Sequence, residues 1–474
     1  MKQAKNFFWY LFSFGGNSFI QLISLWFFAK HLSKEDFGIY ALIAVFGIIT
    51  VSISNLGLLS VYQRNFFDLD DKSKEELLFS IISFIIINLI IIILVTLFFF
   101  EGINVFFFKK KLGSFLWLLI GQTYFVFHSI NQFFFAKLKN TYKAKTFSYL
   151  TLLEKSLAFG IALIVIIVFH YRYEAILLGQ MCSVLILFFY FLYSNIFGKG
   201  LKFNLGLLKA SLKLSIPLSP VQIVKVVGSQ SDKYMISYFG NFSGLGVYDI
   251  ALKLGNLSFV FNTALQNVFS PKVYQQLFLN DRNKLKRIGD YLTPFYFLTF
   301  LFSLIICLFV EEIIYFFLNN EFIQAIPIVV LFSSLYAIQF FTKQPQLLYA
   351  KKTKLLSVIS LLFIVANIIT NIPFIYYFGI LGAAYSTIIT GIVYVIVYHY
   401  YGQKFVCIEW EYRKIFLIFI SYLFIITSIL SMYFFEINYC YRLFMKITYI
   451  SIFIFLGIMM KIVNKENLKK IFSQ

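Results

Sequence analysis

Seven ionisable residues lie inside long apolar stretches of this sequence, and they are its first candidates for chemistry. They are Glu154, Lys155, Lys225, Asp232, Lys233, Asp249 and Lys253. By insertion scales, a charge at the centre of a bilayer costs about 2.5–3.5 kcal/mol, so such residues normally face a water-filled interior or one another. Five of the seven fall between residues 214 and 268. This part of the chain is therefore expected to handle an ion or a polar ligand.

The spacing of polar residues places several of these charges on common helix faces, because residues three, four and seven apart lie on one side of an α-helix. One such face within 214–238 carries Gln222, Lys225, Ser229 and Asp232. A second face within 244–268 carries Asp249, Lys253, Asn256 and Thr263, and a weaker stripe within 7–29 carries Ser13, Asn17, Gln21 and Ser24. Together these faces indicate a hydrated cleft between two halves of the molecule.

Some of these charges also have structural interpretations. Asp249 precedes Lys253 by one helical turn, which is the favourable orientation for an ion pair, and the two would neutralise each other. Asp232 and Lys233 lie near the end of their segment, where a long side chain can reach the interface. For each of these residues, a structural and a functional role stay equally open.

Lys225 differs from the others because it lies deeper and no acid lies one turn away, which favours a functional role. Glu154 and Lys155 are adjacent, and a local ion pair is favoured over a place in the cleft. Pro217 and Pro220 lack backbone donors, so they predict a kink or a gating bend in the segment 214–238.

The composition identifies an integral membrane protein. Of the 474 residues, 60% are hydrophobic and 13% are charged, against about 45–50% and 25% in soluble domains. The four cysteines are far apart, and no HExxH, GKS/GKT or GxSxG motif occurs. Neither a metal, another cofactor nor catalytic residues are expected, so the protein is not expected to be an enzyme.

Apolar runs between charge clusters predict an all-α, polytopic fold with about fourteen transmembrane helices of about 20 residues each. Their approximate ranges are 7–29, 37–61, 77–100, 113–136, 146–169, 174–197, 214–238, 244–268, 291–314, 323–345, 354–377, 380–402, 414–435 and 442–463. The alternation of polar and apolar residues expected of barrel strands is missing. The short connections leave no room for a soluble domain.

The distribution of Lys and Arg predicts the orientation of the chain. With the N-terminus inside, the inner segments hold 29 of these residues and the outer segments hold 8. This asymmetry predicts that both termini are cytoplasmic and that the number of spans is even. It also accounts for most of the net charge of +20, because a basic cytoplasmic face lies beside anionic membrane lipid. No nucleic-acid partner is therefore expected.

The charged stretch FAKHLSKEDFGIYAL, residues 28–42, has a partial copy 208 residues further on. In the first copy, Ser33 is the expected N-cap of the second helix, at an outer hairpin tip. The pairs aligned at this offset are 37–40 with 245–248, Gly47 with Gly255, and 174–175 with 382–383. We therefore expect two six-helix lobes, helices 1–6 in residues 1–200 and helices 7–12 in residues 201–403. Helices 13 and 14 and a cytoplasmic tail follow in residues 404–474.

Three stretches resemble motifs of polysaccharide flippases, the Wzx-type exporters of the MOP (MATE-like) superfamily. Residues 28–42 resemble A-R-x-L-G-P-E-x-F-G-x-Y, residues 232–254 resemble D-R-x-x-L-G-x-x-x-G-x-Y-x-x-A-x-K, and residues 379–386 (GILGAAYS) resemble G-x-x-G-A-A-x-A. Lys30 and Lys233 stand where the family has Arg, and Ser33-Lys34 replaces Gly-Pro. Lysine keeps the positive charge at both positions. If the arginines of the family bind a ligand through two parallel hydrogen bonds, lysine would lose that bidentate contact.

The resemblance implies a flippase that moves undecaprenyl-diphosphate-linked oligosaccharide repeat units from the inner to the outer leaflet of the bacterial cytoplasmic (inner) membrane. The units would serve a surface polysaccharide such as O-antigen or capsule, and transport would proceed by alternating access. The expected partners are this substrate, membrane lipid, a polysaccharide polymerase and a chain-length regulator.

The resemblance also assigns roles to the polar residues. Lys225 and Lys253 would contact phosphate as point charges. The sugar hydroxyls would contact Asn17, Gln21, Gln222 and Asn256. Ion coupling or charge balance would fall to Asp232, Asp249 and Glu154.

Other functions stay open. A drug exporter of the same superfamily would share the two lobes, and only cargo assays separate it from a flippase. A polysaccharide polymerase is disfavoured, because such enzymes usually carry a large outer loop with catalytic residues, and none is found near 101–112 or 436–441. A lipid II flippase is disfavoured because its charged first-helix signature is missing. A non-transporting scaffold would leave the charges within 214–268 unexplained.

Overall fold

The computed structural model describes residues 2–109, 112–195, 202–278, 284–318 and 320–462. These residues form helices and no strands, and nine of the described helices are long and apolar enough to span a membrane, or ten if the bent pair α9–α10 counts as one span. The prediction of an all-α, polytopic membrane protein is confirmed. The predicted boundary between residues 200 and 201 and the part of the predicted tail after residue 462 lie outside the described residues.

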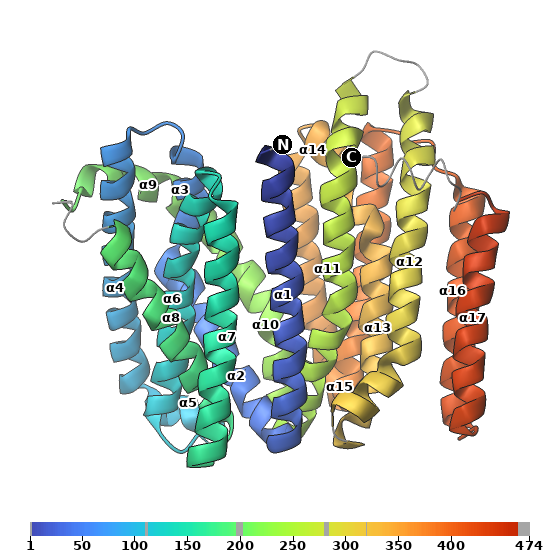
Figure 1. Cartoon of the computed structure of the whole chain (residues 1–474), viewed down its shortest axis with the longest axis horizontal. Coiled ribbons are helices and arrows are strands. Elements are labelled where there is room, and N and C mark those ends of the chain that lie inside the picture. Colours follow the sequence, from blue (N-terminus) through green and yellow to red (C-terminus); the bar gives the residue numbers. More distant parts are fainter. Residues whose placement is uncertain (1, 110–111, 196–201, 279–283, 319, 463–474) are drawn as a thin grey trace. The chain divides into compact units, whose positions relative to one another are not determined.

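The chain divides into two compact units, residues Met1–Gly246 and Val247–Gln474 (Figure 1). Unit 1 contains α1 (Lys2–His31), α2 (Lys34–Asn55), α3 (Leu58–Asn65), α4 (Asp71–Phe98), α5 (Phe100–Phe106), α6 (Phe115–Asn140), α7 (Ala144–Phe169), α8 (Tyr173–Asn195), α9 (Leu205–Ser215), the 3₁₀ turn η1 (Ile216–Leu218) and α10 (Ser219–Phe239). α11 (Phe242–Phe278) begins in unit 1 and continues into unit 2. Unit 2 also contains α12 (Lys284–Phe317), η2 (Asn320–Gln324), α13 (Ala325–Ile338), η3 (Gln339–Lys343), α14 (Gln346–Tyr349), α15 (Thr353–Phe405), α16 (Tyr412–Phe434) and α17 (Tyr439–Met459). The division into two six-helix lobes and a C-terminal pair stays a prediction.

Each of the fourteen predicted segments overlaps a described helix, and some of them, including 37–61, 214–238 and 323–345, also run over a break between helices. Two of them share α15, which has 53 residues. A straight helix of this length would extend about 80 Å, far more than a single crossing of the bilayer needs. α15 breaks at Gly379, where φ is 59° and ψ is −135°, between the two predicted segments. α1, α6, α10 and α11 are less apolar than the other long helices, so their crossing of the membrane stays a prediction.

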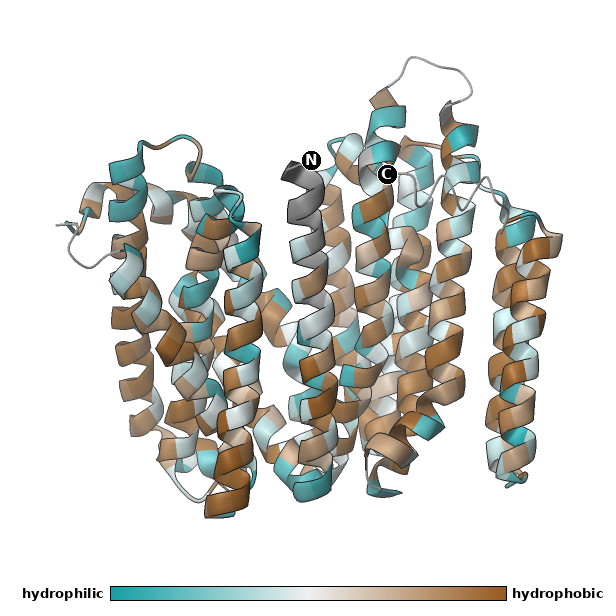
Figure 2. Cartoon of the chain, in the orientation of Figure 1, coloured by the Kyte–Doolittle hydropathy of each residue, from teal (hydrophilic) through white to brown (hydrophobic). Residues whose placement is uncertain are grey.

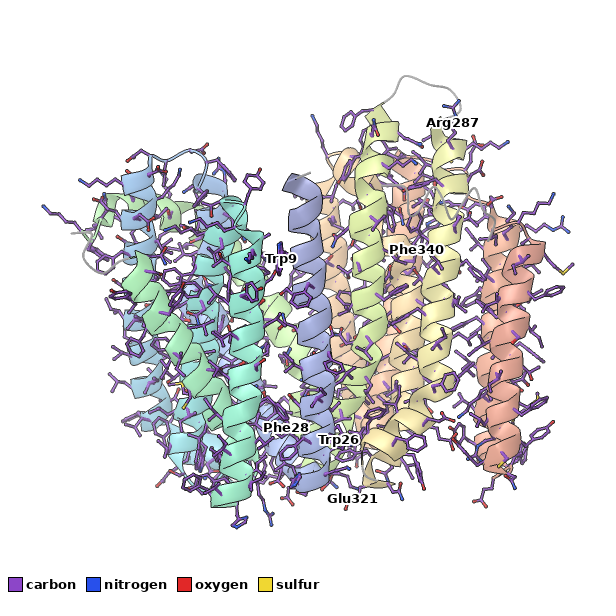
Figure 3. All side chains as sticks on the ribbon, viewed as in Figure 1. Trp9, Trp26, Phe28, Arg287, Glu321 and Phe340 are labelled. Atoms are coloured by element: carbon purple, nitrogen blue, oxygen red, sulfur yellow. The ribbon has the colours of Figure 1, made fainter. Side chains whose placement is uncertain are left out.

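Two tryptophans support a membrane crossing by α1. Figure 3 shows Trp9 and Trp26 toward opposite ends of this helix. The two residues are 17 positions apart in α1, which corresponds to about 25 Å along a helix axis. The ammonium of Lys145 lies 5.8 Å from the Trp9 ring, and that of Lys30 lies 4.3 Å from the Trp26 ring. Tryptophan is enriched at both membrane interfaces, where one end of the ring system is wet and the other apolar. The two rings therefore fit the two boundaries of a hydrocarbon layer.

Polar caps define where several helices begin. Ser33 accepts a hydrogen bond from the Asp36 N–H and the Asp36 carboxylate accepts one from the Ser33 N–H, so the predicted N-cap of the second helix is confirmed as a capping box. Asp70 caps α4 in the same way, accepting from the Ser73 N–H at 3.3 Å. Because these hydrogen bonds favour the charged form, they lower the pKa of the Asp70 carboxyl from its ordinary value.

In unit 1, α6 lies at the centre and packs against α2, α4 and α8. Its residues Phe133, Phe134 and Phe135 are buried, and the Phe134 ring stacks on Phe191 of α8 with the ring centres 4.7 Å apart. Figure 2 shows apolar residues along the middle of the helices and hydrophilic ones at many of their ends, as expected for a protein that spans a bilayer.

In unit 2, α12 has the corresponding central place and packs against α13, α16 and α17. The Phe297 ring of α12 stacks on Phe453 of α17 with the ring centres 5.2 Å apart. The buried Ser303 hydroxyl lies 2.7 Å from the Tyr422 hydroxyl of α16. The last two helices thus pack on the rest of unit 2 through both apolar and polar contacts with α12.

Candidate functional site

The predicted polar face of α10 is present in the structure. Lys225 is exposed and forms no ion pair with any described residue, although it lies well inside the predicted span. Gln222, one turn earlier, lies against α3 at Gly57, where a Cβ would come within 2.7 Å of its side-chain oxygen. Asp232 is half-buried and accepts a hydrogen bond from the Lys233 N–H at 3.0 Å. α10 also packs against α2 within unit 1. The roles of these residues stay predictions.

The two prolines of this region lie at a break in the helix. Pro217 is in the 3₁₀ turn η1, and Pro220 is the second residue of α10. α9 and α10 meet there at an angle of 61°. Proline removes an N–H donor and restricts the preceding residue, so the break lies where the sequence predicts a kink. A gating role for this bend stays a prediction.

On the polar face of α11, the ion pair expected from the sequence is formed. The Lys253 ammonium lies 2.7 Å from the carboxylate of Asp249, which is buried. The positive charge of Lys253 is therefore balanced by the acid one turn earlier. Asn256, the next residue of this face, is exposed.

The polar residues along α1 have two kinds of surroundings: some contact α7, and others are exposed. The Asn17 amide donates to the Ser13 hydroxyl at 3.4 Å, and Ser13 lies 2.7 Å from the Thr151 hydroxyl of α7. Gln21 is exposed. Asn17 thus belongs to a polar contact with α7, Gln21 lies on the surface, and the roles of both residues stay predictions.

Glu154 has a partner that the sequence analysis did not assign. Its buried carboxylate lies 2.9 Å from Nδ1 of His128 on α6, while the adjacent Lys155 is exposed. The close partner of Glu154 is therefore His128 of α6, and a local interaction with Lys155 stays a prediction. Nε2 of His128 lies 3.4 Å from the Gln132 amide. The result is a carboxylate–imidazole–amide chain that connects α7 to α6.

A larger charged cluster was missed by the sequence analysis. Glu311 and Glu312 belong to α12 and lie at the end of the predicted segment 291–314, but the sequence analysis did not count them among the ionisable residues inside the spans. The Lys446 ammonium of α17, which is fully buried, lies 2.5 Å from Glu311 and 2.8 Å from Glu312. The Arg442 guanidinium lies 2.6 Å from Glu311, and the Tyr433 hydroxyl donates to the same carboxylate. Two acids and two bases thus form a neutral network between α12 and the α16–α17 pair.

A signal for this network was present in the sequence. Two adjacent acids stand at the end of one apolar segment, and two bases four residues apart begin another. On helices, such residues present complementary charges on single faces. The pattern was not used, because these four residues stand at the ends of their predicted segments and were not counted as charges inside the spans.

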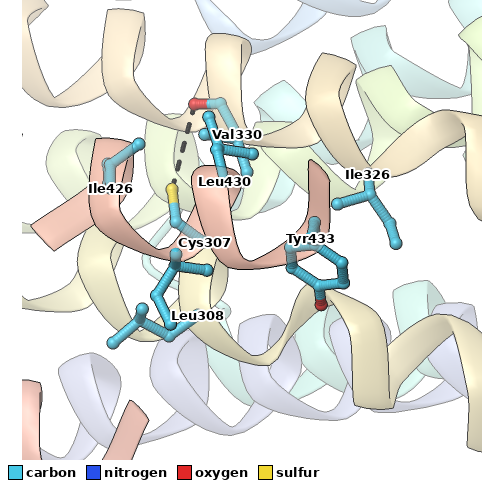
Figure 4. Close-up of a pocket in the computed structure, with 8 residues that line it drawn as sticks. Cys307, Leu308, Ile326, Val330, Ile426, Leu430 and Tyr433 are labelled. Atoms are coloured by element: carbon cyan, nitrogen blue, oxygen red, sulfur yellow. Dashed lines mark hydrogen bonds between the residues drawn. The ribbon is translucent and has the colours of Figure 1, made fainter. Parts of the chain in front are cut away.

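The apolar hollow shown in Figure 4 is not a headgroup site. It lies between α12, α13 and α16 and is too narrow for a water molecule. Apart from Cys307 and Tyr433 its lining residues are aliphatic. The Cys307 thiol lies 3.8 Å from the carbonyl oxygen of Val330. Sugars and phosphates need donors and cations, which this hollow does not offer.

Comparison with known proteins relates this chain to one sequence family and to several solved structures. Residues 27–289, more than half of the chain, match a family model described as polysaccharide biosynthesis protein. No curated protein matches the sequence. The lipid II flippase MurJ in an inward closed conformation superposes with a TM-score of 0.73 at 17% identity, covering 96% of this chain and 99% of its own. A multidrug resistance MATE transporter of the MOP superfamily, in an inward-facing conformation, gives 0.62 at 14% identity, covering 82% and 94%.

At these identities the solved structures establish the fold. The fold is the polytopic one shared by this lipid II flippase and this MATE transporter. The prediction that the protein is not an enzyme agrees with both comparisons. No cargo follows from the fold alone, because one architecture can host several functions.

Proposed function

The chain belongs to the polysaccharide biosynthesis protein family, and from this premise we propose that it is a flippase for lipid-linked oligosaccharides. Its cargo would be repeat units carried on undecaprenyl diphosphate, moved from the inner to the outer leaflet of the bacterial cytoplasmic membrane. Alternating access between two six-helix lobes would expose the cargo site to one side at a time. The flipped unit would then serve O-antigen or capsule synthesis by a polysaccharide polymerase.

The observation that supports this proposal most directly is Lys225. A cation inside a membrane span is costly unless it pairs with an acid or faces water. Lys225 is exposed and has no acidic partner among the described residues, whereas Lys253 is balanced by Asp249. An anionic cargo headgroup would supply the missing counter-charge during transport. Gln222, one turn away on the same face, would contact the sugar hydroxyls.

The direction of transport rests on the distribution of charge. The 29-to-8 excess of Lys and Arg on alternate connections supports cytoplasmic N- and C-termini. In this orientation, the prolines at the α9–α10 break lie near the cytoplasmic end of α10. A bend at this place would open the cargo site toward the leaflet in which lipid-linked sugars are assembled.

The test is a deletion of the gene in its own host, complemented with the wild-type chain, Lys225→Ala or Lys225→Arg. We expect the deletion to abolish the surface glycan and to trap undecaprenyl-linked repeat units in the inner leaflet. Lys225→Ala should restore transport poorly at normal expression, and Lys225→Arg should restore it better because the charge is kept.

Other outcomes identify the alternatives. A normal glycan with altered drug sensitivity would contradict the flippase and favour the drug exporter, whose fold the chain shares. Single repeat units that reach the outer leaflet but are not polymerised would point to the polymerase instead.

A further inference from the structure

The chain breaks after helix α13, and this break positions Lys343, a lysine that the sequence analysis did not include among the site residues. α13 ends at Ile338, and the chain continues through the 3₁₀ turn η3 to Lys343 before the short helix α14. Neighbouring side chains hold this break in place. The Gln266 amide of α11 donates to the Lys343 carbonyl at 3.1 Å, and the Tyr398 hydroxyl of α15 donates to the Gln344 carbonyl at 3.0 Å. The backbone at Lys343 is thus fixed between two helices of unit 2.

The Lys343 side chain lies across α11. Its ammonium is 3.3 Å from the Thr263 hydroxyl oxygen and 4.1 Å from the centre of the Phe259 ring. Thr263 donates its own proton to the Phe259 carbonyl at 2.9 Å, so its oxygen is left to accept from the ammonium. The ring face attracts the cation as well. Two residues one turn apart on α11 therefore hold this charge in one place.

The charge of Lys343 is not balanced. The side chain is half-buried, yet it forms no ion pair with any described carboxylate. An ammonium has three N–H donors, and the Thr263 contact uses one of them. A partly desolvated cation with two donors to spare is a site that an anion would stabilise.

This position continues the polar face of α11. Asn256 and Thr263 are seven residues apart, so they share a face and lie about 10 Å apart along the helix axis. Lys253, one turn before Asn256, is already paired with Asp249 at 2.7 Å. Of the two lysines along this face, Lys343 is the one whose charge is available to a ligand.

We propose that the ammonium of Lys343 binds a phosphate group of the polyprenyl diphosphate headgroup, as an anion subsite of unit 2 that includes Thr263. This inference rests on the proposed flippase function and replaces Lys253 by Lys343 as the phosphate-binding lysine of this face. Lysine binds phosphate as a point charge, and the Phe259 ring and Thr263 supply the positioning that such a charge otherwise lacks. Asn256, about two turns away from Thr263, would face the attached sugars.

The test measures binding of undecaprenyl diphosphate to the full-length protein in lipid nanodiscs. The variants are Lys343→Met, Lys343→Gln and Lys343→Arg. Lys352→Met is the matched control, because the Lys352 ammonium also lies over a phenylalanine ring, that of Phe405 at 4.9 Å, and its side chain is exposed. We expect both neutral variants to weaken binding about tenfold or more, because a hydrogen bond to a charged group is lost. Lys343→Arg and Lys352→Met should bind nearly as well as the wild type.

Each other outcome of the binding experiment contradicts a specific part of the proposal. Wild-type binding that persists unchanged in Lys343→Met and Lys343→Gln overturns the subsite and leaves the flippase in place. A wild-type protein that does not bind undecaprenyl diphosphate overturns the flippase and the subsite with it. Inorganic pyrophosphate is added to compete with undecaprenyl diphosphate for the protein. If it displaces the lipid at a concentration equal to that of the lipid, the site binds the free anion. That result overturns the assignment of the site to the lipid headgroup. Thermal unfolding of each variant shows whether a loss of binding comes from misfolding. If one of the two neutral variants, Lys343→Met or Lys343→Gln, does not fold, the other one provides the test.

Discussion

Gly38 of α2 and Gly246 of α11 pack against each other's helix in a reciprocal manner. A Cβ on Gly38 would lie 1.9 Å from the Phe242 carbonyl oxygen, and a Cβ on Gly246 would lie 1.9 Å from the Lys34 carbonyl oxygen. Residues 34 and 38 become residues 242 and 246 at the 208-residue offset of the predicted repeat. The four residues of this crossing are thus related by the offset of the sequence motif, and the division into two lobes stays a prediction.

We expect Gly38→Ala and Gly246→Ala to destabilise the protein. Alanine ordinarily improves a helix by up to about 1 kcal/mol over glycine. Here the added methyl group meets a backbone oxygen, which cannot rotate away, and overpacking of this kind costs about 1–3 kcal/mol. Thermal unfolding of the purified variants in detergent measures the net effect, and both variants should melt below the wild type.

Gly160→Ala in α7 is the control for this prediction, because a Cβ there has no heavy atom within 4 Å. It should leave the melting temperature unchanged or raise it. If Gly38→Ala behaved like Gly160→Ala, the two helices would not approach each other as closely as described.

Lys446→Met should be among the most destabilising substitutions in unit 2. The lysine is fully buried and contacts both Glu311 and Glu312, so its removal leaves two carboxylates with Arg442 as their remaining base. Breaking a buried ion pair by removing one partner costs about 3–5 kcal/mol. The loss should appear in thermal unfolding and in easier proteolysis of the α16–α17 pair.

Two further variants separate charge from packing in this network. Glu312→Gln combined with Lys446→Met should recover part of the lost stability, because one unpaired carboxylate is removed. Lys414→Met is the surface control, since Lys414 and Glu411 form a partly exposed pair that is worth about 0–1 kcal/mol. Equal losses in Lys414→Met and Lys446→Met would argue against a buried network.

Glu154→Gln should leave the fold intact and reduce transport. Glutamine can keep a hydrogen bond to His128, so unfolding should change little, but the carboxylate that would carry an ion or balance charge is gone. Glycan export and melting temperature are measured together on the same variants. Lys155→Gln, which changes the exposed neighbour, should affect neither. Export that stays at the wild-type level in Glu154→Gln would remove this residue from the transport mechanism.

The sequence predicted the class of fold and the helices well because both depend on local patterns. Apolar runs of bilayer length, the Ser33 cap and the prolines at positions 217 and 220 act within one or two turns of themselves. Even the Asp249–Lys253 pair is local, since the two residues are one turn apart. Each of these features could be assigned without knowing what any helix packs against.

The partners that were missed belong to contacts between helices distant in sequence. Glu154 meets a histidine on α6, and Lys343 meets α11 some 80 residues earlier. A periodicity shows which face of a helix is polar but does not show which other helix covers that face. The Glu311–Lys446 contact likewise joins two helices, α12 and α17, across 135 residues of sequence.

Replacing Pro217 and Pro220 together by alanine should lower transport without lowering stability. Alanine restores backbone donors and helical freedom at the 61° break between α9 and α10, so the bend is no longer imposed by the sequence. Pro373→Ala in α15 is the matched control: this proline lies inside a helix, where it costs about 3 kcal/mol, and its replacement should raise the melting temperature and leave transport unchanged. Glycan export and thermal unfolding, measured on both variants, distinguish a gating bend from a passive one. A double alanine variant that exports normally would show that the bend at η1 forms without the prolines or is not needed for transport.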